Sequence, residues 1–377
     1  MWCDLVYLIS AKKYNMKKLT ILSLTFLLVA NFVFSQGCIA IRNISGFGQY
    51  NLTDNAFSTS DWQVNITSRY FKSFRDFSRK IDLKTPEQNE SINRVFSTDV
   101  TITRLMRNGW SLNLSLPYTV NSRESSREHG GDNTRRHTTH SAGLGDIRLT
   151  IYKWLLTPTV RQRGNIQVGL GVKFATGDYK YQDYFYRNDS TRVLSPVNPS
   201  IQLGDGGTGI ITELNTFYIL NAVRSISLYG NFYYLINPRD ISGTQFTAGR
   251  IPTAIQIRSG NVDLSVPDIY SIRFGAYYNL NKHFSFSGGL RDEGAPVHDL
   301  FGKSNGARRP GHNMSVEPGI IYKLKKTSWY IYTPVTISRR INQSVPDKIT
   351  ADLTGVDMTA PGGSGNYQVF VGVQFKL

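Results

Sequence analysis

The sequence predicts an all-β protein, a closed antiparallel transmembrane β-barrel of about 12 strands. Segments of about ten to fourteen residues in which apolar and polar side chains alternate recur along the chain. The connections between these segments are alternately short and long, which is typical of transmembrane barrels. The last segment keeps its alternation up to the C-terminal residue, Leu377. Such an apolar end is typical of the final strand of outer-membrane barrels.

The composition fits this fold class and excludes others. Of the 377 residues, 40% are hydrophobic, 12% are aromatic and 33 are glycines. Apart from one N-terminal stretch, no run of about 18 apolar residues is present, which excludes a bundle of membrane-spanning helices. The regular alternation of apolar residues excludes disorder over most of the length. The two cysteines, Cys3 and Cys38, provide neither a disulfide framework nor a multi-cysteine metal site for the rest of the chain.

The N-terminal stretch has the pattern of a secretory signal peptide. Lysines at 17 and 18 precede a continuous apolar run over residues 19–33, and Ser35 offers a cleavage site. We therefore expect residues 1–35 to be an upstream segment plus signal peptide, and residues 36–60 to be a short periplasmic segment. Residues 61–377 form the predicted barrel. A lipoprotein modified at Cys38 is the alternative.

The predicted strands follow from the alternation in chain order. Each is bounded by turn residues such as glycine, proline, asparagine or a charged pair. They cover residues 61–74, 94–107, 109–118, 143–156, 163–175, 208–220, 225–236, 267–280, 282–291, 312–324, 327–338 and 365–377. The long connections are 75–93, 119–142, 176–207, 237–266, 292–311 and 339–364. An even number of strands places both termini on the periplasmic side.

Alternation within a strand assigns side chains to the two faces of the barrel. In the strand 163–175, Val168 and Leu170 face one way, while Gln167 and Gly169 face the other. An ionisable residue on the lipid face would cost roughly 2 to 4 kcal/mol near the midplane. We therefore expect charged strand residues to face the lumen, either along a wet path or in an ion network that fills a narrow barrel. The candidates are Arg69, Asp99, Arg148, Lys173, Glu213, Arg273, Arg291 and Glu317.

Two glycine-rich motifs carry a family resemblance. Residues 143–147 read GLGDI, and residues 169–179 read GLGVKFATGDY, downstream of Pro117 and Tyr118. This combination, over roughly residues 110–180, resembles the phenol-degradation MetA-pathway family of outer-membrane proteins. The resemblance implies an outer-membrane barrel that imports hydrophobic or aromatic compounds. The chain departs from fatty-acid-type transporters because only residues 36–60 precede the first strand, too few for a long N-terminal hatch.

The motif residues also have a local interpretation. Gly143, Gly145 and Gly177 permit tight turns where loops meet strands. Asp146 and Asp178 lie at the outer ends of neighbouring predicted strands. We expect both carboxylates to accept hydrogen bonds from turns rather than to contact a ligand.

The predicted function is a passive channel or transporter for small solutes, hydrophobic or aromatic ones among them, in the outer membrane of a Gram-negative bacterium. Its expected partners are outer-membrane lipid, the solute and the barrel-assembly machinery. Nucleic acid, metal and other cofactors are not expected. The alternative is a structural or adhesive barrel with a plugged lumen.

An enzyme is the less favoured class. A lipid hydrolase would need a serine nucleophile with a histidine base at the outer leaflet, and His137, His140 and Ser141 lie at that height. However, neighbouring residues of a strand point to opposite faces, which separates His140 from Ser141. The same histidines with His129 offer a possible metal site, but a solvated loop is the preferred interpretation.

Overall fold

The computed structural model describes residues 62–83, 90–130, 136–156, 163–188, 190–220 and 225–377. The predicted signal peptide and the segment 36–60 lie outside these ranges. Within them, no helix has the length and apolar character that a membrane crossing requires.

The strands form a closed antiparallel barrel of twelve strands, which confirms the predicted fold class. Each strand pairs with its neighbours in the chain, and β1 pairs with β22 to close the ring. Three of the twelve are interrupted and carry two labels each: β6 with β7, β17 with β18, and β19 with β20. The barrel strands are β1 (Trp62–Ser73), β4 (Ile92–Leu105), β5 (Trp110–Ser125), β6 (His137–Leu144), β7 (Arg148–Trp154), β8 (Gly164–Lys173), β11 (Gly209–Ile219), β12 (Ile226–Ile236), β15 (Ile269–Asn279), β16 (Phe284–Ala295), β17 (Gly311–Val316), β18 (Gly319–Lys323), β19 (Thr327–Tyr332), β20 (Val335–Ile341) and β22 (Gln368–Lys376).

Three strands that were predicted to be continuous are interrupted in the structure. Residues 145–147 separate β6 from β7, and residues 317–318 and 333–334 make the two later breaks. Pro318 and Pro334 lack the N–H that a strand ladder needs, so both breaks have a local cause. At the first break, the side chain of Thr176 takes over the ladder by accepting from the N–H of Ile147 at 2.8 Å and donating to the carbonyl of Gly145 at 2.9 Å.

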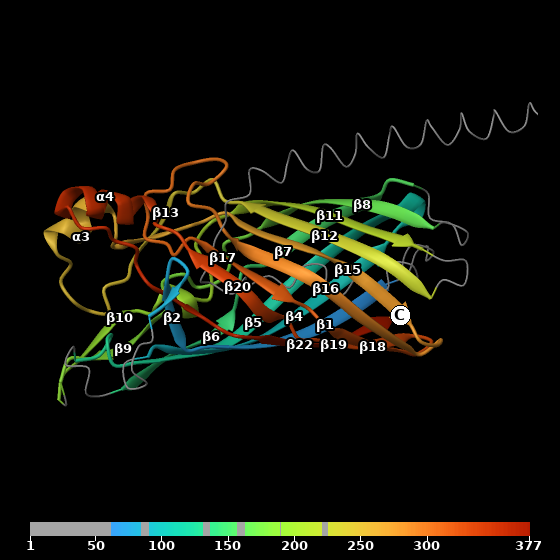
Figure 1. The fold of residues 1–377 in the computed structure, drawn as a ribbon, viewed down its shortest axis with the longest axis horizontal. Coiled ribbons are helices and arrows are strands. Elements are labelled where there is room, and N and C mark those ends of the chain that lie inside the picture. The colour runs from blue at the N-terminus through green and yellow to red at the C-terminus, as the bar shows by residue number, and fades with distance from the viewer. Residues whose placement is uncertain (1–61, 84–89, 131–135, 157–162, 189, 221–224) are drawn as a thin grey trace, which may run out of the picture. The chain divides into compact units, whose positions relative to one another are not determined.

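The long connections carry secondary structure of their own and lie at one end of the barrel, opposite the C-terminus (Figure 1). The predicted loop 119–142 is too long, because β5 continues to Ser125 and β6 begins at His137. The elements of this end are β2 (Arg75–Ser78), β3 (Ile81–Asp82), β9 (Gln182–Tyr186), β10 (Arg192–Pro196), the 3-10 helix η5 (Pro199–Ile201), β13 (Ile241–Gln245), α3 (Ala254–Ser259), β14 (Asp263–Ser265), α4 (Val345–Thr354) and β21 (Gly362–Ser364). A further 3-10 turn, η4 (Arg107–Gly109), joins β4 to β5.

The two faces of the barrel wall differ as the alternation predicts. On β8, Val168 and Leu170 are exposed on the outside, whereas Gln167 is buried inside. The interior is also filled by tyrosines that lie over glycines of neighbouring strands. A Cβ on Gly372 would lie 2.2 Å from the ring of Tyr330, and Gly169 faces Tyr152 in the same way. Each glycine thus provides the space for a ring that covers it.

Candidate functional site

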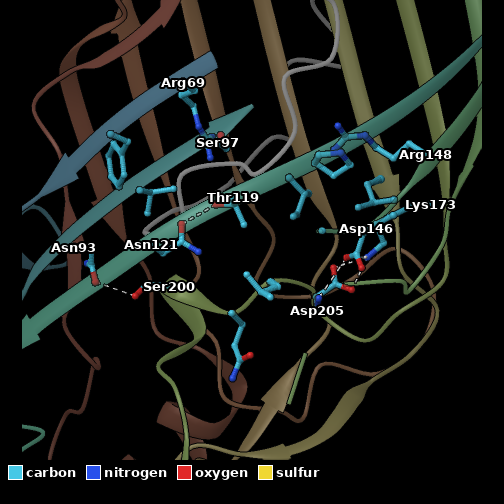
Figure 2. Close-up of a pocket in the computed structure, with 18 of the residues that line it drawn as sticks. Arg69, Asn93, Ser97, Thr119, Asn121, Asp146, Arg148, Lys173, Ser200 and Asp205 are labelled. Atoms are coloured by element: carbon cyan, nitrogen blue, oxygen red, sulfur yellow. Dashed lines mark hydrogen bonds and ion pairs between the residues drawn. The ribbon is translucent and has the colours of Figure 1, made fainter. Parts of the chain in front are cut away.

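An inner cavity of about 80 Å³ lies within the barrel (Figure 2). Apolar side chains from four strands and one loop, Phe71, Val95, Leu235, Ile269 and Leu203, form part of its wall. The other part is polar and charged. The charged residues that line it are Arg69, Asp146, Arg148, Lys173 and Asp205.

The loop between β8 and β11 folds back against the barrel wall, and its residues Ser200, Gln202, Leu203 and Asp205 line this cavity. The carbonyl of Ile201 accepts hydrogen bonds from the side chains of Ser141 and Asn121, the latter at 3.3 Å. The hydroxyl of Ser200 donates to Asn93 Oδ1 at 3.0 Å. Ile201 itself is fully buried. We call residues 200–205 the inserted segment.

A second cavity of about 320 Å³, the outer cavity, lies on the far side of the inserted segment. It is lined by the connections between strands, with Tyr179, Phe246 and Leu264 among its apolar residues. The two cavities share lining residues, and three of these belong to the inserted segment. The shared residues are Asn93, Ser200, Gln202, Asp205 and Ile269. The inserted segment therefore forms part of the partition between the two cavities.

Lys173 binds the inserted segment electrostatically. Its ammonium group contacts both carboxylate oxygens of Asp205, and it lies 3.7 Å from Asp146 Oδ2 (Figure 2). Lys173 is 4% exposed, so its end of the ion pair is shielded from solvent.

The motif carboxylates accept hydrogen bonds from turns. Asp146 Oδ1 accepts from the N–H of Gly177 at 3.0 Å, and Asp178 Oδ1 accepts from the N–H of Lys180 at 2.9 Å. Asp146 also lies beside Lys173, a neighbour that the turn interpretation did not include. Gly143, Gly145 and Gly177 all lie close to Leu203 of the inserted segment.

Most of the predicted lumen residues form two groups of ion pairs and hydrogen bonds on the inner side of the barrel wall. In the first, Arg148 donates to Asp99 Oδ2 at 2.8 Å, and Tyr152 donates to Glu213. All eight predicted lumen residues are buried, with exposures from 1% for Arg69 and Glu317 to 8% for Arg148.

The second group is a charged layer of Arg273, Glu317, Arg291 and Glu293. Glu317 accepts from Arg273 Nε at 3.1 Å and from Arg291 Nη1 at 3.5 Å, and Glu293 accepts from Arg291 Nε at 2.7 Å. Gln368 of β22 donates to Glu293 at 2.7 Å. The rings of Tyr229 and Phe370 cover the two guanidinium groups.

Sequence reasoning omitted two acidic partners, Glu293 and Asp205. Glu293 lies two residues after Arg291 on one strand, and this spacing places both on the same face. The predicted strand ended at Arg291 and left Glu293 in the predicted connection 292–311, whereas β16 continues to Ala295. Asp205 lies in a long connection without alternation, and nothing local indicates that it turns back into the barrel.

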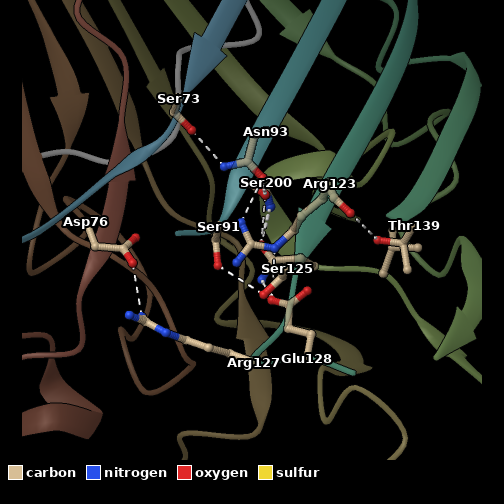
Figure 3. A network of polar contacts seen from close by, with 12 residues as sticks. Ser73, Asp76, Ser91, Asn93, Arg123, Ser125, Arg127, Glu128, Thr139 and Ser200 are labelled. Carbon is tan, nitrogen blue, oxygen red and sulfur yellow. Dashed lines mark hydrogen bonds and ion pairs between the residues drawn. The ribbon is translucent and has the colours of Figure 1, made fainter. Parts of the chain in front are cut away.

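A polar network surrounds the outer cavity (Figure 3). Arg123 donates to Glu128 at 2.9 Å and to Asn93 at 2.7 Å, and Arg127 donates to Asp76 at 3.0 Å. Burial raises the pKa of Asp76, and the charge of Arg127 opposes that rise. This network links the ends of β4 and β5 to the inserted segment through Ser200, which also donates to Asn93.

The histidines considered for catalysis do not form a Ser–His pair at Ser141. Ser141 is buried and donates to the carbonyl of Ile201, whereas the neighbouring His140 is exposed and lies beside Asp183. Across the described ranges, no group of three or more His, Cys, Asp or Glu side chains could hold a metal ion.

His129 is instead part of an aromatic contact between two hairpins. Its ring stacks on Phe185 and lies 5.3 Å from the ring of His137, and its Nδ1 accepts from the N–H of Tyr186 at 3.1 Å. Burial, reinforced by His137, lowers the pKa of His129 to about 4.

Comparison with known proteins shows the fold. No family model and no curated protein sequence matches this chain. An outer-membrane channel from Pseudomonas putida F1 matches with a TM-score of 0.52 at 9% identity, over 85% of this chain and 97% of that chain. The translocator domain of an autotransporter from Neisseria meningitidis has a TM-score of 0.46 at 10% identity, covering 87% and 92%. A toluene transporter from Ralstonia pickettii has a TM-score of 0.39 at 12% identity, covering 86% and 91%.

The chain has the fold of an outer-membrane β-barrel. The likeness to the Pseudomonas channel carries this conclusion, and at 9% identity it extends to the fold alone.

Proposed function

We propose that the protein is a passive channel for small solutes in the outer membrane of a Gram-negative bacterium. The observation that carries the proposal is the pair of cavities that adjoin through the inserted segment. A solute entering from the loop end would occupy the outer cavity first and then the inner one. No catalytic or metal-dependent step is part of the proposal.

The walls of the inner cavity support a preference for small solutes with apolar surface, as the resemblance to the MetA-pathway family implies. Phe71 and Val95 pack together on one side, and Leu235 packs with Ile269 on another. Apolar side chains on the inner face of a barrel are favourable where they meet an apolar partner instead of water. The inner cavity offers that environment to a hydrophobic or aromatic solute.

Export and assembly complete the proposal. Residues 1–35 would direct secretion and be removed, and residues 36–60 would remain in the periplasm. The barrel, residues 61–377, would contact outer-membrane lipid through its exposed apolar face and reach the membrane through the barrel-assembly machinery. The strand β22 would be recognised by that machinery.

The charged layer favours a second candidate function. Arg273, Arg291, Glu293 and Glu317 are each at most 2% exposed, and they are paired with one another across the interior. A layer of this kind fills space and offers no free charge to a solute. This observation supports the alternative of a structural or adhesive barrel with a plugged lumen.

Conductance of the refolded protein in planar bilayers separates the two functions. A channel gives discrete openings that Ser97→Trp reduces, because Ser97 lines the inner cavity. Phe96→Trp is the matched control, since Phe96 is exposed on the outer face of the same strand and should leave conductance unchanged. Silent bilayers for the folded wild-type protein would favour the plugged barrel.

Solute class is tested by swelling of liposomes that contain the protein. We expect a small aromatic alcohol to enter faster than a sugar of similar size, and Phe71→Asn to reduce this difference. Equal rates for the two solutes would contradict the preference for apolar surface while leaving the channel intact.

A further inference from the structure

The glycine motifs at 143–146 and 176–178 form a seat for the inserted segment. A Cβ on Gly177 would lie 2.6 Å from the carbonyl oxygen of Leu203, and a Cβ on Gly145 would lie 3.2 Å from the same atom. A Cβ on Gly143 would lie 2.9 Å from Leu203 Cδ1. Real Cβ atoms essentially never lie within 3 Å of a backbone atom, so any side chain at Gly177 would displace residue 203 or the backbone beside it.

The inserted segment contributes a glycine to the same contact. A Cβ on Gly204 would lie 2.6 Å from the carbonyl oxygen of Gly177 and 2.8 Å from Asp146 Oδ1. Two backbones therefore approach each other with no side chain between them. A glycine on each side is the residue that permits such an approach.

Polar contacts hold the two backbones together. Asp146 accepts from the N–H of Gly177 at 3.0 Å through one oxygen and from the N–H of Asp205 at 3.4 Å through the other. Lys173 partly offsets the negative charge of both carboxylates, because its ammonium group contacts Asp205 and lies 3.7 Å from Asp146. Without Lys173, two partly buried carboxylates would face each other without this cation, which is unfavourable.

We propose that this seat holds the inserted segment across the lumen and thereby sets the size limit for solutes that pass from the outer to the inner cavity. Gly145, Gly177 and Lys173 are then specificity-determining residues that act through the position of Leu203 and Asp205. The proposal rests on the channel function proposed above. It assigns the glycine motifs a task other than tight turns.

The consequence of unseating is a larger passage. Ser200, Gln202 and Asp205 line both cavities, so a shift of the inserted segment away from Gly177 joins them. The remaining attachments, from Asn93, Asn121 and Ser141 to residues 200 and 201, keep the segment tethered at its other end. The barrel wall itself is unchanged by this movement.

The first experiment tests whether the inserted segment is held in the seat, and it does not depend on transport. It measures the rate of labelling at residue 203. Leu203→Cys is introduced with Cys3→Ser and Cys38→Ser, and the folded protein is treated with a maleimide. Leu203 is 5% exposed, so we expect slow labelling in this background. Adding Gly177→Ala should accelerate labelling at least about tenfold, because the new Cβ has no space beside Leu203. Lys173→Met should act in the same direction if Gly177→Ala does not fold.

The matched control is Gly288→Ala, since a Cβ on Gly288 meets nothing within 4 Å. Fast labelling in the parent, or equal rates for Gly177→Ala and Gly288→Ala in folded protein, would overturn the seat.

The second experiment measures passage. Gly177→Ala and Lys173→Met should raise single-channel conductance at least about twofold and admit larger sugars in liposome swelling, because conductance follows the width of a constriction. Gly288→Ala should behave as wild type. Variants that label faster at residue 203 but pass the same solutes would refute the size limit. A wild-type protein that conducts nothing would instead refute the channel function, and the labelling rates would still test the seat.

Discussion

Glu317 shares its carboxylate between the guanidinium groups of Arg273 and Arg291 in the barrel interior. Glu317→Leu leaves Arg273 buried without its carboxylate, whereas Arg291 keeps Glu293. We expect this variant to lose about 3 to 5 kcal/mol of stability. The double variant Glu317→Leu with Arg273→Met removes the buried charge and should recover most of that loss. Urea unfolding in lipid vesicles measures both, and equal losses in the two variants would contradict the pairing.

His129 predicts a pH dependence at the loop end. An unperturbed histidine has a pKa near 6.5, and burial lowers that of His129 to about 4. The folded protein therefore binds this proton less readily than the unfolded chain does. The contribution of neutral His129 to the free energy of unfolding is therefore fully present above pH 6.5 and is lost as the pH falls towards 4. His137, Arg123, Arg187 and Asp183 are the charged or titratable groups whose fields act on His129.

Protonation of His129 also removes the acceptor for the N–H of Tyr186. We expect the exchange protection of the Tyr186 amide to fall as the pH drops through about 4 in the wild-type protein, because His129 is protonated there in the folded state. His129→Phe keeps the stacking on Phe185 and should show protection that varies little over this range. A wild-type profile as flat as that of the variant would exclude His129 as the cause.

At the scale of single elements, the two faces of β22 differ in whether they tolerate a charged side chain. Val371 is 47% exposed on the outer face, and Gln374 is buried inside, where it donates to Gln63 at 3.0 Å. We expect Val371→Arg to cost roughly 2 to 4 kcal/mol and to reduce insertion, because its charge would face lipid. Gln374→Arg on the same strand should insert normally. Heat-modifiable migration on gels reports the folded fraction. A lower folded fraction for Gln374→Arg than for Val371→Arg would show that the inner and outer faces of β22 are assigned the wrong way round.

The elements differ in how far the sequence predicts them. Alternation in β8 and β22 predicts both the strand and its inner face, because a side-chain period of two residues is a local property. The extension of β5 to Ser125 was missed, since residues 121–125 are polar on both faces once the strand leaves the apolar zone. Pro318 and Pro334 were available as break signals, whereas the break at 145–147 depends on Thr176 of another strand end.

The candidate site was predictable only where it lies on strands. Parity alone places Arg148 and Lys173 inside. The position of Asp205 depends on close contact between Gly177 and Gly204, which are far apart on a connection without periodicity. The local sequence pattern gives no indication of such a contact. The glycine motif could be recognised in the sequence, but the segment that it contacts could not.

For the whole molecule, the orientation of the barrel can be measured in cells. Asn188 is exposed at the loop end, and Lys326 is exposed in the short turn between β18 and β19. We expect Asn188→Cys to react with an impermeant maleimide on intact cells, and Lys326→Cys to react only after the outer membrane is permeabilised. The opposite labelling pattern would show that the barrel has the opposite orientation in the membrane.

The closing pair of strands has a consequence for the order of folding. Gln63 of β1 and Gln374 of β22 are hydrogen-bonded although 311 positions separate them in the chain. The edge of β1 that pairs with β22 therefore has no partner until residues 368–376 have been synthesised and delivered. Contacts between such distant residues form slowly, and the intermediate exposes an unpaired edge that other chains can join. We infer that the chain in which β22 has not yet paired is the species most prone to aggregate, so on the proposed route to the outer membrane this protein should depend on holding chaperones.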